Sequence, residues 1–149
     1  MAILSYRRKT LSERQRIDFV FRRESLMRTL KGKVVTGAGN FSLWIEKLQD
    51  HYHNKTGLRL FPGTLNLQLD EPFDLPPDQA RLEAAEYGGT VSVNIIPCII
   101  FGRQAVILRT DKADREPQSR TIIEVACEIK LRDQHQLLDG DEVEVTVAP

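Results

Sequence analysis

The sequence predicts a mainly β fold, a small closed barrel of six strands with one or two helices and an N-terminal helical arm. Two observations predict it. Short stretches in which apolar and polar residues alternate recur along the chain, and turn signals rich in glycine and proline separate them. Few stretches have helical periodicity. Six or so strands with antiparallel links and few helices are typical of a small closed barrel.

The composition is that of one folded domain. A chain of 149 residues is long enough for a sizeable core, and it is too rich in valine, isoleucine and leucine to be disordered. Lysine plus arginine and aspartate plus glutamate both number 21, so no global field would attract nucleic acid or an anionic membrane. We therefore expect neither as a partner.

Targeting signals and cysteine usage bear on localisation. The chain contains no run of about 18 apolar residues that would predict a transmembrane helix, and its start lacks the apolar segment of a secretory signal. Cys98 and Cys127 each lie in an apolar run, which favours reduced core residues over a disulfide or a metal site. These features predict a cytoplasmic protein.

The positive charge is concentrated at the N-terminus. Residues 1–33 hold ten basic and three acidic side chains, and Thr10–Glu13 fits a capping box at the start of a helix over about 11–24. We interpret residues 1–29 as a basic helical arm, followed by a barrel domain over 30–149. The arm is expected to pack on the barrel or on a neighbouring subunit, where it would support an oligomer. Nucleic-acid binding is the weaker alternative, because the arm is short and carries no motif.

A strand, a glycine turn and a helix follow the arm. The strand ends at Val34–Thr36 and the turn is Gly37–Asn40. Ser42 is placed to cap a helix over about 43–55, and Gly57 is placed to end it. The apolar stripe of this helix comprises Phe41, Trp44, Ile45, Leu48 and Tyr52.

The glycine turn suggests an anion site, because glycines let backbone N–H groups approach a phosphate and the helix dipole adds to the attraction. The third glycine of a dinucleotide-binding fingerprint would fall at Ser42, and no Gly-Lys-Ser/Thr follows. The turn is therefore neither a Rossmann motif nor a P-loop, and a plain tight turn is the alternative interpretation.

The stretch Phe61–Asp70 contains a strictly alternating strand after a Pro62-Gly63 turn. Thr64 and Asn66 place a hydroxyl and a carboxamide on one face beside that turn. Such neutral oxygens suit a hard cation such as Mg²⁺ when phosphates supply the negative charge. The alternative is a half-buried strand with a wet outer face. The apolar face comprises Leu65, Leu67 and Leu69, and the polar face also includes Gln68 and Asp70.

The remaining segments are mostly strands. Residues 71–86 are polar and contain three prolines, which indicates a surface excursion with a short helix after Pro77. Residues 111–120 are expected to be an exposed loop. Strands are expected over residues 90–101, 105–110 and 121–129, with a hairpin tip at Gly102-Arg103 and a turn at Asp139-Gly140 before a last strand that carries Val143, Val145 and Val147 inward.

The alternation in residues 121–129 sets the direction of Glu124. Its core face comprises Ile123, Val125, Cys127 and Ile129. Glu124 therefore falls on the other face, with Ile122 and Ala126, and should face a cleft. The run Lys130–Arg132 then leads into a short turn.

Four motifs occur in order over residues 30–147: the glycine turn, Pro62–Asn66, Ile122–Glu124 and Lys130–Arg132. With these motifs the chain resembles the archaeal-type CTP-dependent riboflavin kinases. The resemblance implies a cradle-loop β-barrel that transfers the γ-phosphate of CTP to the 5′-hydroxyl of riboflavin, giving FMN and CDP. It also implies Mg²⁺ as the cofactor.

The resemblance also implies roles for individual residues. Thr64 and Asn66 would ligate Mg²⁺, and Glu124 and Thr121 would contact the flavin. Glu124 would orient the accepting hydroxyl or take its proton, and Arg132 would stabilise charge. The nucleotide would be held by Gly37, Ala38, Gly39 and Asn40 at its phosphates and by Ile129, Lys130, Leu131 and Arg132 at its cytidine.

The sequence departs from the family pattern at two points within the likeness. The glycine turn usually continues with an acid and a third glycine, whereas Asn40-Phe41 follows here and the loop is shorter. The flavin-contacting threonine has three candidate counterparts, Thr110, Ser119 and Thr121. The shortened turn leaves a second hypothesis open, a non-catalytic flavin- or nucleotide-binding module on the same barrel.

Overall fold

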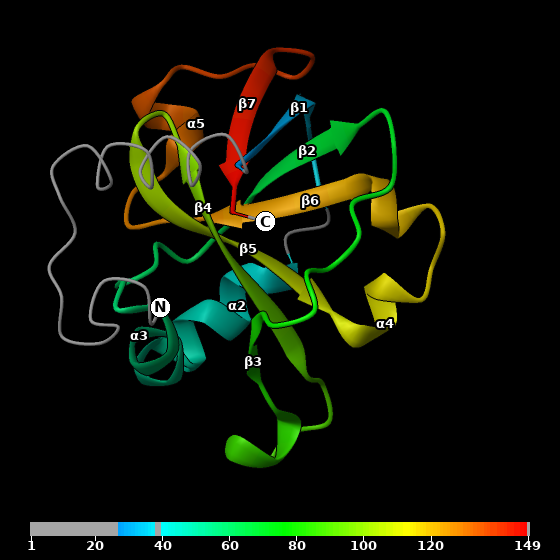
Figure 1. The fold of residues 1–149 in the computed structure, drawn as a ribbon. Helices are drawn as coiled ribbons and strands as arrows, with labels where there is room; N and C mark the ends of the chain where they lie inside the picture. Colours follow the sequence, from blue (N-terminus) through cyan, green and yellow to red (C-terminus); the bar gives the residue numbers. More distant parts are fainter. Residues whose placement is uncertain (1–26, 38–39, 149) are drawn as a thin grey trace, which may run out of the picture.

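The computed structural model describes residues 27–37 and 40–148. The helix expected over 11–24 lies outside this part of the chain, and the first strand begins at Arg28, two residues before the expected boundary of the barrel domain. The described residues form seven strands (Figure 1): β1 Arg28–Val35, β2 Leu65–Leu69, β3 Ala80–Leu82, β4 Val93–Ile100, β5 Arg103–Thr110, β6 Ile122–Ala126 and β7 Glu142–Val147.

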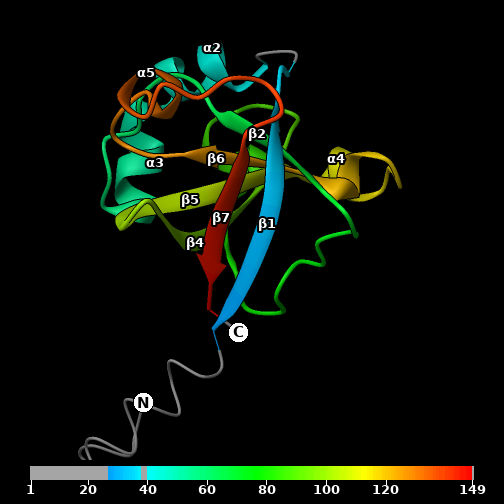
Figure 2. The same ribbon diagram turned by 90° about the horizontal axis from the view of Figure 1, so that it is seen from above.

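Six of these strands form a closed antiparallel barrel. Hydrogen-bonded neighbours follow in the order β4-β5-β6-β2-β1-β7, and β7 returns to the second half of β4. Ile99 pairs with Thr146 at this closure. Figure 2 shows β1 and β7 running side by side. The structure thus confirms the predicted six-stranded barrel.

The seventh strand, β3, corrects the prediction for residues 71–86. The predicted short helix after Pro77 is present, and residues 71–79 are mostly exposed or half-buried. The segment also contains a strand that was not predicted, because β3 pairs with the first half of β4, and both Phe73 and Leu82 are buried. The first half of β4 extends beyond its pairing with β7, so its backbone groups need another partner, which β3 provides. A 3-10 helix, Ala84–Glu86, follows β3.

The barrel interior holds the main hydrophobic core. The three leucines of β2 point inward together with Val34 of β1, as the alternation predicted. The remaining buried members come from β4 to β7 and the adjoining loops, and include Ile96, Cys98, Ile100, Ile107, Ile123, Val125, Cys127, Leu131, Val143, Val145 and Val147.

A second core lies on the outer face of the barrel. Two helices, α2 (Asn40–Lys47) and α3 (Gln49–Thr56), cover outward side chains of β4, β5 and β6 there. Ala126 packs in this core and is 1% exposed, so it lies on the outer face together with Glu124, as the alternation predicted. The helices reach Ala126 at the end of β6 and exclude water from it. The core comprises Phe41, Ile45, Tyr52, Leu58, Leu60, Leu82, Val93, Ile95, Val106, Leu108 and Ala126.

The predicted helix over 43–55 is two helices. Helix α2 starts at Asn40, so Ser42 lies within it and does not cap it. The chain breaks at Leu48, whose φ of −111° and ψ of 30° leave the helical region. Gly57 ends α3 as predicted, in a left-handed conformation with its N–H donating to the His53 carbonyl at 2.8 Å. Within the described residues, none of the helices is long and apolar enough to cross a membrane.

Four local boundaries also differ from the prediction. The hairpin turn is Phe101-Gly102 rather than Gly102-Arg103, because both residues have positive φ (49° and 71°), as a two-residue antiparallel turn requires. Strand β6 ends at Ala126 instead of continuing to residue 129. The short turn expected after the run Lys130–Arg132 is a four-residue helix that starts within that run. The expected loop over 111–120 also contains helical turns, so the additional elements are α4 (Asp111–Asp114), the 3-10 helix Ser119–Thr121 and α5 (Leu131–Gln134).

Candidate functional site

A row of three side chains crosses the outer face of β2, β6 and β5, and its member on β5, Leu108, lies in the core that the helices cover. Glu124 is paired in register with Asn66 on one side and with Leu108 on the other. Because directly paired residues of an antiparallel sheet point to the same face, the three lie side by side. Ile123 and Val125 point into the barrel, as the alternation predicted.

Glu124 is half-buried and has a hydroxyl partner. The Thr64 hydroxyl donates a hydrogen bond to Glu124 Oε1 at 2.8 Å. Burial raises the pKa of the Glu124 carboxyl, and the hydrogen bond from Thr64 offsets part of that rise. A carboxylate whose proton affinity is raised in this way is suited to accept a proton near neutral pH.

Gly37 packs directly over Asn66. An ideal Cβ on Gly37 would lie only 2.5 Å from Asn66 Oδ1, well inside van der Waals contact. Any side chain there would force the carboxamide to turn away. The first glycine of the turn therefore makes room for the carboxamide of a predicted metal ligand. Ala38 and Gly39, predicted to contact phosphate, lie outside the described residues, and Asn40 begins α2.

Two cavities flank this row. The first, which we call the Glu124 cavity, has a volume of about 340 Å³, and the second, the Thr64 cavity, has a volume of about 270 Å³. The Glu124 cavity is lined by residues that include Gly37, Phe41, Asn66, Leu108, Thr110, Lys112, Glu116, Ser119 and Glu124. The Thr64 cavity is lined by Ser42, Phe61, Pro62, Gly63, Thr64, Leu65, Val125, Lys130, Leu131 and Arg132.

The hydrogen bond between Thr64 and Glu124 joins the two cavities, because its donor lines one and its acceptor lines the other. Residues that are distant in sequence meet here from three elements: the turn before β2, strand β6 and, through Gly37, the end of β1. A group bound in each cavity would approach the other at this bond.

The predicted cytidine residues lie around the Thr64 cavity. Lys130 and Arg132 line it, and Leu131 is buried beneath it. The Arg132 guanidinium forms an ion pair with Asp139, which also accepts a hydrogen bond from Thr36. These two contacts hold the pKa of Asp139 below its usual range. Ile129 packs against the barrel core instead.

The three flavin-contact candidates separate in the structure. Thr110 and Ser119 line the Glu124 cavity. The Thr121 hydroxyl accepts a hydrogen bond from Gln68 Nε2 at 2.9 Å and donates one to the Gln118 carbonyl at 2.9 Å. The geometry therefore favours Thr110 and Ser119 over Thr121 as contacts for a ligand in this cavity.

Lys112 and Glu116 line the same cavity but were not among the predicted site residues. They belong to the segment interpreted as an exposed loop. The sequence feature that could have predicted this is Thr110, a residue type that favours the start of a helix. Its hydroxyl accepts a hydrogen bond from the Ala113 N–H and caps α4. The cap turns the segment back toward the barrel, so its charged side chains reach the cavity.

The donor set at Thr64 and Asn66 fits a hard cation. Both offer neutral oxygens, and Glu124 adds a carboxylate beside them. Such a set suits Mg²⁺ when phosphate oxygens complete the ligands. In the described part of the chain, no cluster of three or more His, Cys, Asp or Glu side chains is placed to hold a metal.

The fold and the paired cavities define a small β-barrel domain with a half-buried carboxylate at the junction of two cavities. A family model named CTP-dep_RFKase, described as "Domain of unknown function DUF120", matches residues 34–147, and the chain belongs to this family. The match spans the barrel from the last two residues of β1 to the end of β7.

Similar proteins carry the name riboflavin kinase. The chain is 36% identical over 124 residues to the riboflavin kinase of Methanocella arvoryzae, covering 79% of this chain and 56% of that protein. It is 31% identical over 132 residues to that of Ignicoccus hospitalis, covering 80% and 70%. It is 29% identical to that of Archaeoglobus fulgidus, covering 97% and 66%. The chain thus spans between about half and two thirds of the length of these relatives.

Proposed function

We propose that this domain is a riboflavin kinase that transfers the γ-phosphoryl group of CTP to the 5′-hydroxyl of riboflavin, giving FMN and CDP. The observation that carries the proposal is the hydrogen bond of Thr64 with Glu124 between two cavities. A two-substrate phosphoryl transfer needs two adjoining sites with the reacting groups at their junction.

The Thr64 cavity is suited to the nucleotide. Lys130 and Arg132 at its wall bring positive charge near a polyphosphate, and Ser42 of α2 adds a hydroxyl. The choice of CTP among nucleotides rests on the name of the family, whose model matches residues 34–147 of the chain.

The Glu124 cavity is suited to the acceptor. In the transfer, a bond forms between the 5′-oxygen of riboflavin and the γ-phosphorus while the bond from that phosphorus to the β–γ bridging oxygen breaks. The acceptor hydroxyl loses its proton, and Glu124 takes it in this proposal. The raised pKa of Glu124 suits that role, because a carboxylate of ordinary pKa is a weak base toward an alcohol.

Thr64 and Asn66 would hold Mg²⁺, which supplies neutralisation of the charge on the phosphates when bound. The chain itself orients these ligands. Asn66 lies on the outer face of β2, Thr64 immediately precedes that strand, and Gly37 leaves space for the Asn66 carboxamide. Both residues adjoin Glu124, so the predicted metal ligands and the predicted base lie at one point.

The test is a direct assay of the whole chain. Purified protein is incubated with riboflavin, MgCl₂ and one nucleoside triphosphate at a time, and the products are separated by chromatography. We expect equal amounts of FMN and CDP with CTP, little FMN with ATP, and none after EDTA. Absence of FMN with every triphosphate would overturn the proposal.

A non-catalytic binding module is the second candidate. The shortened glycine turn favours it, since Asn40-Phe41 replaces the acid and glycine of the usual pattern. Equilibrium dialysis with riboflavin and with CTP separates the two. A chain that binds both compounds but forms no FMN is a sensor on the same barrel.

A further inference from the structure

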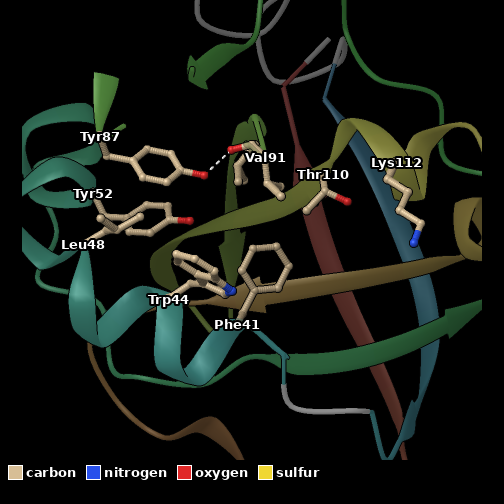
Figure 3. A pocket seen from close by; sticks show the side chains of 9 residues that line it. Phe41, Trp44, Leu48, Tyr52, Tyr87, Val91, Thr110 and Lys112 are labelled. Atoms are coloured by element: carbon tan, nitrogen blue, oxygen red, sulfur yellow. Dashed lines mark hydrogen bonds between the residues drawn. The ribbon is translucent and has the colours of Figure 1, made fainter. Parts of the chain in front are cut away.

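The outer face of β4 is covered by helices over only part of its length. Val93 and Ile95, in the first half of the strand, are 5% and 1% exposed and pack in the core that α2 and α3 cover. Figure 3 shows Trp44 and Tyr52 pointing from these helices toward the strands. Further along the same face, Ile99 is 38% exposed. The two helices therefore leave the second half of this face uncovered.

A groove lies on this uncovered half, and we call it the β4 groove. Its volume is about 370 Å³ and its wall is largely apolar. The wall includes Leu58 after α3, Pro97 and Ile99 of β4, Gln104 of β5 and Thr146 of β7. Ile99 is paired in register with Gln104 on one side and with Thr146 on the other, so these three side chains point to the same face. An exposed apolar groove of this kind is typical of a surface that another segment covers.

The chain leads into β1 at the edge of the β4 groove. Met27, directly before β1, lines the groove and is 40% exposed. Residues 1–26 precede it in the sequence and lie outside the described part of the chain. Thr29 pairs with Thr146, and Thr146 pairs with Ile99, so Thr29 lies two strand spacings, about 10 Å, from Ile99. The N-terminal segment is thus tethered beside the groove.

This N-terminal segment carries an apolar stripe of its own. In the helix predicted over 11–24, Ile17, Val20 and Phe21 follow at spacings of three and four residues and share one face. Phe19 falls on the opposite face. A helix of this length is marginal alone and gains its stability by burying its apolar face against another element. The chain from Phe21 to Met27 spans up to about 20 Å, so the stripe can reach the groove.

We infer that the stripe of Ile17, Val20 and Phe21 docks in the β4 groove of its own chain, with Phe21 beside Ile99 and Gln104. The inference is independent of the proposed function. The tether favours the groove of the same chain over that of a second copy, because a short linker gives the stripe a high effective concentration there. Docking covers Ile99 and lays the N-terminal segment over the line where β4 and β7 close the barrel.

Disulfide trapping in the whole chain tests the position of the stripe. The double variant Phe21→Cys, Gln104→Cys is oxidised with copper phenanthroline and analysed on a non-reducing gel and by mass spectrometry of tryptic peptides. We expect a disulfide within one chain. The matched control combines Phe19→Cys with Gln104→Cys and should stay reduced, because its thiol points away from the groove. The native cysteines are buried, which raises the pKa of both thiols and makes them slow to react.

Limited proteolysis gives an independent measurement on the whole chain. Trypsin cleaves after Arg22 and Arg23, next to the stripe. Ile99→Asp places a charge in the groove at a position outside both cores. It should raise the rate of cleavage at these sites about tenfold or more, in line with the loss of one buried apolar contact. Leu138→Asp, at a position that is 69% exposed and outside the groove, is the control and should be cleaved at the parent rate.

The outcomes distinguish docking on the same chain from docking on a second copy and from no docking. A disulfide that joins two chains places the stripe on a second copy and overturns the inference. Equal trapping of the Phe21→Cys and Phe19→Cys variants, or no trapping of either, also overturns it, as does cleavage of Ile99→Asp at the parent rate. Formation of FMN is measured separately, so failure of this inference leaves the kinase proposal standing.

Discussion

Glu124 combines a strand position that points it outward with an environment that is only partly open to water. Glu124→Gln preserves the shape and removes the basic oxygen. We expect kcat/KM for riboflavin phosphorylation to fall about 10²-fold or more, the range of a general base. Steady-state assays at saturating Mg²⁺ measure the effect. A variant as active as the parent would leave Glu124 as a structural residue of β6.

The same substitution tests the electrostatics of the fold. Because burial raises the pKa of Glu124 in the folded state, the folded chain binds this proton more tightly than the unfolded chain does. Stability therefore falls as pH rises from about 4.3, the ordinary glutamate value, to the folded-state pKa, and this contribution levels off above it. The Glu124→Gln variant has no titrating group at this position, so it does not show this loss of stability. In urea unfolding, the stability gain of the variant over the parent should grow between pH 4 and pH 7, and parallel curves would contradict this.

Asn66 offers a third test at this scale. Asn66→Ala removes a predicted metal ligand on the outer face of β2, outside both cores, so we expect turnover to drop by at least about 10²-fold while the fold is kept. Activity should recover in part at high Mg²⁺. The matched control is Gln68→Ala, two residues along on the same face. Equal activity of Asn66→Ala and parent at limiting Mg²⁺ would remove the metal assignment.

Glu124, Thr64 and Asn66 show which properties of the site can be predicted from the sequence and which cannot. Alternation placed Glu124, Thr64 and Asn66 on outer faces, because side-chain direction along a strand depends only on local geometry. Burial of Glu124 depends on which elements cover that face. Such coverage is a long-range property, and so is the position of Lys112 at the cavity. The pairing of Arg132 with Asp139 depends on how the short segment between them turns.

At the scale of elements, Arg109 of β5 ties the loop beside the Glu124 cavity to the barrel. Its guanidinium is 2% exposed, donates to the carbonyls of Phe73 and Arg120, and pairs with Asp114 of α4 at 3.2 Å. These contacts connect β5 with the segment around Phe73, 36 residues away, and with the nearby segment that contains Asp114 and Arg120. The buried charge therefore acts as a joint between the barrel and the α4 segment.

Arg109→Met should cost about 3 kcal/mol of unfolding free energy, because it leaves buried carbonyls and Asp114 without their donor. Riboflavin affinity should fall with it, since α4 carries part of the cavity wall, while CTP affinity should hold. Chemical denaturation and calorimetry measure both. Lys31→Met is the control, as the exposed pair of Lys31 with Glu144 should contribute less than about 0.5 kcal/mol. A similar loss of unfolding free energy in both variants would contradict the proposed role of Arg109 in connecting the barrel to the α4 segment.

Elements were predicted well where the pattern was local. The strands of the barrel and the cap at Gly57 follow from alternation and backbone preference. The helix break at Leu48 and strand β3 do not follow from local pattern, because both depend on contacts with residues elsewhere in the chain. Gln49 Nε2 donates to the Leu60 carbonyl at the start of α3, and β3 exists to pair with β4.

At the scale of the whole molecule, β7 holds the barrel closed. Thr146 is paired with Thr29 of β1 on one side and with Ile99 of β4 on the other. Thr146→Pro removes an N–H from a strand with two neighbours and should destabilise the domain by several kcal/mol, on the order of 3. Thr146→Val keeps the backbone and should unfold close to the parent in urea. If proline were tolerated equally well, β7 would not be an interior strand.

The adjacency of β1 and β7 sets the order of events during synthesis. The first barrel strand can pair with the last only after residue 147 has been made, and translation of the roughly 110 residues between them takes roughly 6 to 20 s. Any sheet that forms during that interval keeps a free edge at β1, and a free edge is prone to pair with other chains. Ribosome stalling before β7 should therefore yield an aggregation-prone fragment rather than a smaller working domain.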